Sequence, residues 1–151
     1  MAISPEVVKE LRDKTGISVM ECKKALEEAG GDMEKALEIL GKRAIVTAGK
    51  KADRVFGAGT VQSYIHNTGQ IGALVMLSCE TDFVSKNEEF IAFARDIAMH
   101  AAAMRPLDIA ELFAQPFIKD ETKTISDLIS QATQKFGERV EVSALTISAV
   151  R

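Results

Sequence analysis

The sequence contains no tryptophan and one tyrosine, and aromatic residues make up 5% of its 151 residues. A protein that binds nucleic acid by stacking bases needs more aromatic side chains than this. The net charge of −3, from 19 basic and 22 acidic residues, also lacks the positive excess that is typical of nucleic-acid binders. The composition therefore gives no reason to expect direct contact with nucleic acid.

Cysteine and long apolar runs are scarce as well. Cys22 and Cys79 are the two cysteines, and two histidines do not complete a zinc site with them, so we expect no metal and no cofactor. No stretch approaches the roughly 18–20 apolar residues of a membrane-spanning helix. The first residues lack the basic-then-apolar pattern of an export signal. We expect a soluble, cytoplasmic protein with reduced thiols, although a bridge between subunits through either cysteine stays open.

Motifs that mark an active site are absent from the sequence. It has no G-x-x-x-x-G-K-[ST] loop, no G-x-S-x-G elbow and no H-E-x-x-H motif. His66 falls beside a predicted turn and His100 late in a predicted helix, so neither has an evident nucleophile to serve. Glu80 follows Cys79, and its charge raises rather than lowers a thiol pKa. We expect no enzyme activity, and a hydrolase built on Cys79 or His66 is the least favoured hypothesis.

The N-terminal residues predict three short amphipathic helices. Ser4, Ser18 and Asp32 each stand where a helix needs an N-cap, and Gly30 and Gly31 end the second helix. The buried side of that second helix is expected to consist of Val19, Cys22, Leu26 and Ala29. Three helices of this length make a unit that is only just large enough to bury a core without disulfides.

Small and basic residues follow these helices. We interpret residues 42–56 as a basic linker, partly helical, between a helical domain of residues 1–41 and a second domain of residues 57–151. A solvated linker is the favoured interpretation of this segment. Contact with RNA through its basic side chains is the weaker alternative.

The second domain begins with a predicted hairpin. Residues 59–66 alternate in polarity, and a turn at residues 67–70 leads to a second strand over residues 71–77. That second strand is apolar on both sides, so we expect both of its faces to be covered. A last strand is predicted over residues 140–150. Its apolar side is expected to include Val140, Val142 and Ala144.

Two helices are predicted between these strands. Ser85 and Glu88 have the spacing of a capping box at the start of the first, and Thr124 and Gly137 bound the second. The fold class is therefore α+β: a three-helix bundle, then a small antiparallel three-stranded sheet with helices packed against one face.

The segment Thr81-Asp82-Phe83-Val84 lies between a buried strand and a helix. Phe83 packs beneath that helix in one interpretation, with Asp82 favoured by the positive helix N-terminus. In the other, the segment protrudes as a wedge that anchors a protein interface. Met20, beside Val19 at the start of the second helix, is a further candidate contact surface.

Three segments together resemble the signatures of one protein family. Residues 11–32, LRDKTGISVMECKKALEEAGGD, resemble the N-terminal signature of bacterial elongation factor Ts. Residues 79–87, CETDFVSKN, resemble its second signature, and residues 115–120, QPFIKD, resemble a third. The three occur in the family's order and span most of the chain.

The resemblance implies a guanine-nucleotide exchange factor for the translation GTPase elongation factor Tu. It also implies that the first helices form a ubiquitin-associated-like bundle, which docks on the GTPase through Arg12, Val19 and Met20, where Val19 replaces a more usual methionine. The family's Thr-Asp-Phe-Val element falls on Thr81, Asp82, Phe83 and Val84 and reaches toward the magnesium site of the partner to dislodge the ion.

The chain departs from the family's usual pattern in three respects. Residues 104–114 replace a longer helical stretch, the core unit occurs once rather than twice, and the last strand lacks the usual arginines. Members with a single core unit tend to be dimers, so the resemblance implies a homodimer. The alternative function is a binding module that does not catalyse exchange and carries a dimerisation scaffold.

Overall fold

A three-helix bundle forms the N-terminal part of the protein. The computed structural model describes residues 2–151. The helices of the bundle are α1 (Pro5–Thr15), α2 (Val19–Glu28) and α3 (Met33–Lys50). Each has the predicted N-cap, whose side-chain oxygen accepts a hydrogen bond from a backbone N–H three residues along the chain: Ser4, Ser18 and Asp32.

The core of the bundle agrees with the expected apolar stripe of α2 except at its first residue. Cys22 and Leu26 are fully buried, together with Leu11 of α1, and Ala29 is partly buried against them. Val19 is 50% exposed, so the prediction that it is buried is wrong. It is the first residue of the helix and lies at the end of the stripe.

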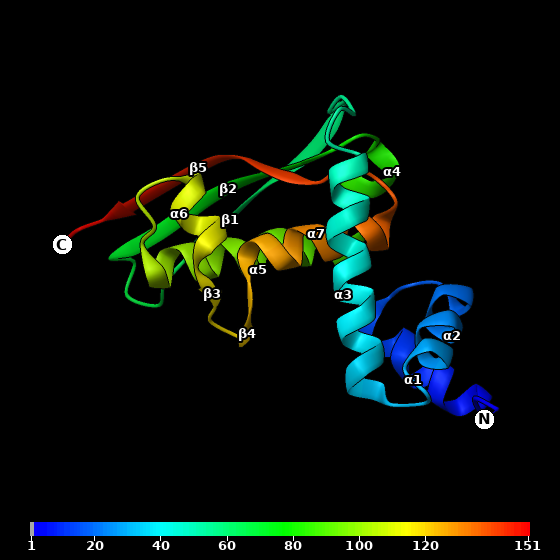
Figure 1. The fold of residues 1–151 in the computed structure, drawn as a ribbon. Helices are drawn as coiled ribbons and strands as arrows, with labels where there is room; N and C mark the ends of the chain where they lie inside the picture. Colours follow the sequence, from blue (N-terminus) through cyan, green and yellow to red (C-terminus); the bar gives the residue numbers. More distant parts are fainter. Residues whose placement is uncertain (1) are drawn as a thin grey trace.

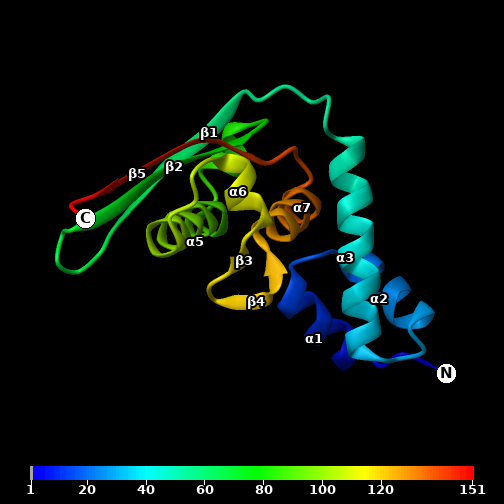
Figure 2. The same ribbon diagram turned by 60° about the vertical axis from the view of Figure 1, so that its left-hand side comes forward.

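Helix α3 extends well beyond the predicted end of the first domain. It continues through residues 42–50 as one helix of 18 residues and buries Ala44. Its later turns contact α7 of the second half of the chain (Figures 1 and 2). Residues 51–57 then connect it to the first strand. The division at residues 41 and 56 stays a prediction.

An antiparallel sheet with helices on one face forms the second half of the chain, which confirms the α+β fold class (Figures 1 and 2). Its strands, in spatial order, are β1 (Ala58–Ile65), β2 (Ile71–Cys79) and β5 (Glu141–Ala149). The hairpin of β1 and β2 turns at Gly69, whose φ of 71° suits glycine. The helices are α4 (Asp82–Ser85), α5 (Glu88–Met104), α6 (Ile109–Ala114) and α7 (Ile125–Phe136).

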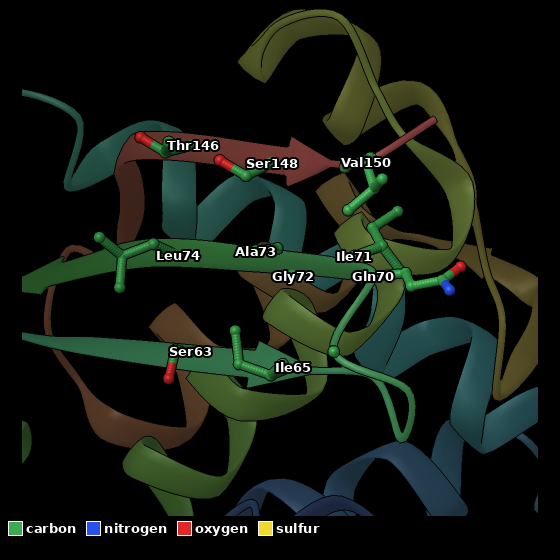
Figure 3. Close-up of a pocket in the computed structure, with 12 residues that line it drawn as sticks. Ser63, Ile65, Gln70, Ile71, Gly72, Ala73, Leu74, Thr146, Ser148 and Val150 are labelled. Carbon is green, nitrogen blue, oxygen red and sulfur yellow. The ribbon is translucent and has the colours of Figure 1, made fainter.

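The outer face of the sheet is uncovered, contrary to the prediction for residues 71–77, and it carries apolar side chains on β1 and β2 and hydroxyl side chains on β5. Leu74 and Met76 of β2 are 46% and 39% exposed, and they lie beside Val61 and Ile65 of β1. A shallow hollow of about 500 Å³ lies over this face, between Ile65 and Ser148 (Figure 3). An apolar strand is covered on both faces only where another layer packs on each side, and in one copy of this chain the helices lie on one side.

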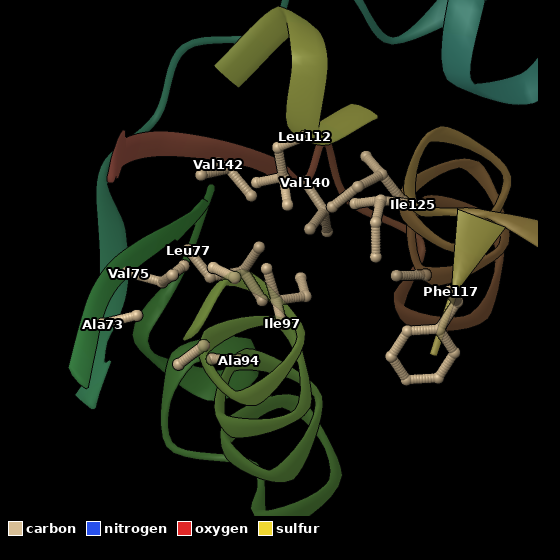
Figure 4. Close-up of a cluster of buried hydrophobic side chains, with 14 of the residues drawn as sticks. Ala73, Val75, Leu77, Ala94, Ile97, Leu112, Phe117, Ile125, Val140 and Val142 are labelled. Carbon is tan, nitrogen blue, oxygen red and sulfur yellow. The ribbon is translucent and has the colours of Figure 1, made fainter. Parts of the chain in front are cut away.

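The inner face of the sheet carries the larger core (Figure 4). Val75 and Leu77 of β2 are fully buried against Ile97 of α5. Leu112 of α6 and Ile125 of α7 also belong to this core (Figure 4). This arrangement fixes the end of β2, and with it the start of the segment at Thr81.

Strand β5 changes its alternation at a bulge. Val142 pairs with Leu77 and Ala144 pairs with the adjacent Met76, so Ser143 is the extra residue. Beyond the bulge Leu145 faces the core and Ala144 is exposed. The prediction that Ala144 shares a side with Val142 is therefore wrong.

Two further local features differ from the predictions. Asn87, not Ser85, caps the long helix: its Oδ1 accepts hydrogen bonds from the N–H groups of Glu89 and Phe90. Ser85 instead ends the short helix α4. A small two-stranded sheet of β3 (Pro116–Phe117) and β4 (Asp120–Thr124) adds to the three predicted strands.

Candidate functional site

The segment Thr81–Val84 forms a projection between β2 and α5. Asp82 to Ser85 make the single turn of α4, with Thr81 at its N-cap position. Phe83 is 92% exposed, whereas Val84 packs against the core and Ser85 is buried. Phe83 does not pack beneath a helix, so that interpretation is wrong. Burial of a phenylalanine would contribute about 1.5–3 kcal/mol, which this position forgoes in the isolated chain.

Glu138 holds the base of this projection. Its Oε1 accepts hydrogen bonds from the backbone N–H of Glu80 at 3.0 Å and of Thr81 at 2.9 Å. Its Oε2 accepts from the Thr81 hydroxyl at 2.6 Å. The carbonyl of Thr81 accepts from the thiol of Cys79 at 3.3 Å. Every polar group of Thr81 is therefore bonded, although the residue lies at the surface.

A second set of hydrogen bonds joins the same two segments, and here residue 80 supplies the carboxylate. The carboxylate of Glu80 accepts a hydrogen bond from the backbone N–H of Arg139 at 2.5 Å and lies 3.4 Å from the Arg54 guanidinium. Arg139 in turn donates to the Arg54 carbonyl at 2.7 Å, and its guanidinium lies 4.2 Å from the centre of the Phe56 ring. The Lys51 ammonium donates to the carbonyl that precedes Glu138 at 3.0 Å.

Three chain segments thus meet beneath the projection: residues 51–56, 80–81 and 137–139. The sequence analysis selected the second of them and missed the third. The available signal was a helix-ending glycine followed by two charged residues. It does not indicate which part of the chain those charges contact, because Glu138 lies 57 positions after Thr81.

Arg12, Val19 and Met20 lie on the bundle and are exposed. Arg12 is in the last turn of α1, and Val19 and Met20 are the first two residues of α2, with Met20 66% exposed. Arg12 lines a cleft of about 490 Å³ between the bundle and the core, and Asn87 and Glu89 at the start of α5 line its other side. The structure therefore brings Arg12 toward the segment that follows Phe83.

The residues of the hydrolase hypothesis are not arranged for catalysis. Burial, with a further contribution from the Glu138 carboxylate, raises the pKa of Cys79 to about 11, so its thiol is protonated near neutral pH. His66 is exposed, and its Nδ1 lies 3.1 Å from the Tyr64 hydroxyl. Among residues 2–151 no group of three His, Cys, Asp or Glu side chains could hold a metal ion. The helices of the same residues include none that is long and apolar enough to cross a membrane.

Comparison with known proteins identifies close relatives. The family model described as elongation factor TS matches residues 80–150. Elongation factor Ts of Thermosipho melanesiensis is 41% identical over 186 residues, which cover 93% of this chain and 95% of the relative. That of Desulforamulus reducens is 40% identical over 185 residues, covering 93% and 85%. That of Desulfotalea psychrophila is 53% identical over 110 residues, covering 73% and 56%.

The two longer alignments span more positions than the 151 residues of this chain, so those relatives contain residues that it lacks. The identity nevertheless extends over nearly the whole chain. It therefore includes both the helical bundle and the sheet with the projecting segment. The chain belongs to the elongation factor Ts family.

Proposed function

We propose that this protein is a cytoplasmic guanine-nucleotide exchange factor that binds elongation factor Tu in its GDP form and promotes GDP release by displacing the magnesium ion. The observation that carries the proposal is the 92% exposure of Phe83 on a short segment whose first residue, Thr81, has all of its polar groups bonded. An apolar ring presented in this way is suited to insertion into a partner.

The mechanism needs no covalent chemistry. GDP is held in a GTPase by contacts to its phosphates from backbone N–H groups and from a magnesium ion. Phe83 inserts between elements of the partner and displaces the groups that hold the ion, while the Asp82 carboxylate repels the phosphates. Once the ion is lost, the diphosphate loses its main counter-charge and dissociates.

Binding of the factor and binding of GDP are reciprocally coupled. The factor weakens nucleotide binding by the same ratio by which the nucleotide weakens binding of the factor. Each ~1.4 kcal/mol of coupling changes the affinity about tenfold. A coupling of about 3 kcal/mol therefore suffices for a change of more than a hundredfold.

Docking on the GTPase is assigned to Arg12, Val19 and Met20. Val19 and Met20 are adjacent apolar side chains that are half or more exposed, and Arg12 supplies a cation within the same bundle. Methionine and arginine are both enriched in protein interfaces. The bundle then binds the partner while the projection acts on its nucleotide site.

The outer face of the sheet is proposed as the interface of a homodimer. Leu74 and Met76 lie on the central strand, and Val61 and Ile65 flank them on β1. The chain has one core unit, and a second copy supplies the layer that its apolar sheet lacks. Two such faces stacked about 10 Å apart would form a β-sandwich.

Release of a fluorescent GDP from elongation factor Tu tests the exchange activity. Release is expected to become faster as the concentration of this protein rises and to level off at saturation. Unchanged release at a concentration that saturates binding would contradict the proposal. It would select the alternative function, a binding module with a dimerisation scaffold.

A further inference from the structure

The side chain of Glu138 is aimed at the base of the projection by the end of α7. Gly137 follows the helix with a φ of 71°, a left-handed conformation that turns the chain sharply. The next residue, Glu138, therefore points away from the helix and across to residues 80 and 81. Its two carboxylate oxygens there accept from three donors, two backbone N–H groups and one hydroxyl.

These bonds fix the orientation of α4 more than they hold the fold together. Hydrogen bonds to a charged acceptor are stronger and shorter than neutral ones. Thr81 is nevertheless at the surface, so water can satisfy its N–H and hydroxyl when the carboxylate is removed. The helix α4 is a single turn with no side-chain cap of its own, and only Glu80 and Thr81 connect it to β2.

We infer that Glu138 is a positioning residue for nucleotide exchange, which fixes Thr81 so that Phe83 is presented to the partner in one orientation. This inference rests on the proposed function. A projection that is already ordered loses less conformational freedom on binding, so more of the contact free energy remains to weaken GDP binding. Glu138 acts through Phe83 and does not itself contact the nucleotide site.

Substitutions of Glu138 separate positioning from charge. Glu138→Ala removes all three contacts, and we expect the maximal rate of GDP release to fall about tenfold, the effect of one charge-assisted hydrogen bond. Glu138→Gln removes the charge but keeps Oε1 for both N–H groups, and its amide can donate to the Thr81 hydroxyl. Its rate is expected to stay within about threefold of the original. Equal losses in both variants would overturn the inference.

Glu141→Ala is the matched control. Glu141 is a carboxylate three residues along the chain, and its side chain contacts Arg139 rather than Thr81. We expect its release rate to stay close to that of the original protein. A loss as large as that of Glu138→Ala would show that any change of local charge suffices and would overturn the inference.

A double substitution tests whether Glu138 acts through Phe83. If it does, adding Glu138→Ala to Phe83→Ala lowers the remaining rate less than about twofold, because coupled residues are not additive. Independent, multiplying losses would overturn the inference. Should Glu138→Ala unfold at the assay temperature, Glu138→Asp, whose shorter side chain cannot make all three contacts, replaces it. Unchanged release in Glu138→Asp would then count against positioning.

Hydrogen exchange gives a measurement that does not depend on the partner. In the isolated protein, the Thr81 amide is expected to be protected and to lose at least about tenfold of its protection in Glu138→Ala, while amides of β2 stay protected. Unchanged protection would overturn the inference even if exchange activity is confirmed. Failure of the unaltered protein to accelerate GDP release, with the amide protected as expected, would instead contradict the proposed function.

Discussion

Nε2 of His100 lies 2.9 Å from Oε1 of Gln115, and both residues belong to the second half of the chain. Nδ1 of His100 accepts a hydrogen bond from the backbone N–H of Ile118 at 3.2 Å, so the proton is assigned to Nε2, which donates to Gln115. The imidazole is fully buried and joins α5 to the segment that carries the QPFIKD signature. Burial lowers the pKa of His100, and the bond to Gln115 opposes this shift.

The buried His100 predicts a pH dependence of stability. Because its pKa is lower in the folded state, the unfolded chain binds the proton more readily. Its contribution to the unfolding free energy is complete above the ordinary pKa of about 6.5 and is lost as the pH falls below that value, by at most about 1.4 kcal/mol per pH unit. Denaturant titrations between pH 7.5 and 5 measure this slope.

His100→Gln is expected to have a shallower slope of unfolding free energy against pH than the original protein over this range. His66→Gln, which removes the exposed imidazole instead, is the control. The same slope in the original protein and in His100→Gln would contradict the prediction.

Phe83→Ala is expected to separate exchange from stability. The ring is 92% exposed, so its removal should change the unfolding free energy by less than about 0.5 kcal/mol. Truncation of an interface anchor lowers the binding free energy by about 2 kcal/mol or more, so GDP release should slow by at least about tenfold. Thermal unfolding and the release assay measure the two effects.

Leu107→Ala is the matched control, because Leu107 is an apolar side chain that is 91% exposed elsewhere on the surface. It is expected to keep both the release rate and the melting temperature. A large loss of stability in Phe83→Ala would show that the ring supports the fold, contrary to its exposure.

Leu74→Glu is expected to dissociate the proposed homodimer. The side chain lies on the central strand of the uncovered sheet face, where a carboxylate would be buried in the proposed dimer interface. The monomer should remain folded, because Leu74 is 46% exposed in a single copy. Sedimentation velocity gives the mass of each form.

Ile45→Glu provides the comparison for Leu74→Glu. Ile45 is 57% exposed on α3, away from the sheet, and its substitution is expected to leave the mass unchanged. A monomeric mass for the unaltered protein at micromolar concentrations would contradict the dimer.

The two cysteines are expected to react slowly in the folded protein. Both are fully buried, and burial raises the pKa of Cys22 as well as that of Cys79. With a pKa of about 11, only about one Cys79 in ten thousand is a thiolate at pH 7. A chromogenic disulfide reagent should modify the thiols only after denaturation. Rapid reaction in the native protein would contradict the burial, and buried thiols also leave neither cysteine available for a bridge between subunits.

Local signals in the sequence predicted the helix ends well. A Ser, Asp or Thr before an apolar stripe marks a helix start because its side-chain oxygen bonds a nearby N–H, and Thr124 with Asp127 forms a complete capping box. The same rule failed at Ser85, where a single-turn helix comes first and Asn87 caps the longer one. Two candidate caps within three residues cannot be ranked from local spacing alone.

Features that depend on distant contacts were harder to predict. The apolar residues of β2 do not reveal whether a second layer belongs to the same chain or to another copy, so Leu74 was expected to be covered. The bulge at Ser143 arises from pairing with β2. Glu138 was missed because its three donors lie in a loop that only the folded sheet brings to it. The sequence indicated Phe83 as a candidate contact residue, but it did not indicate the contacts that hold the segment beneath it.

Helix α3 joins the bundle to the core without a break from Met33 to Lys50. An α-helix advances ~1.5 Å and rotates ~100° with every residue. Its length therefore sets both the distance and the relative rotation between the bundle and the sheet. Deleting one residue from it would turn the bundle by more than a quarter of a circle relative to the sheet. Under the proposed function, the bundle and the projection could then no longer contact the same GTPase at once.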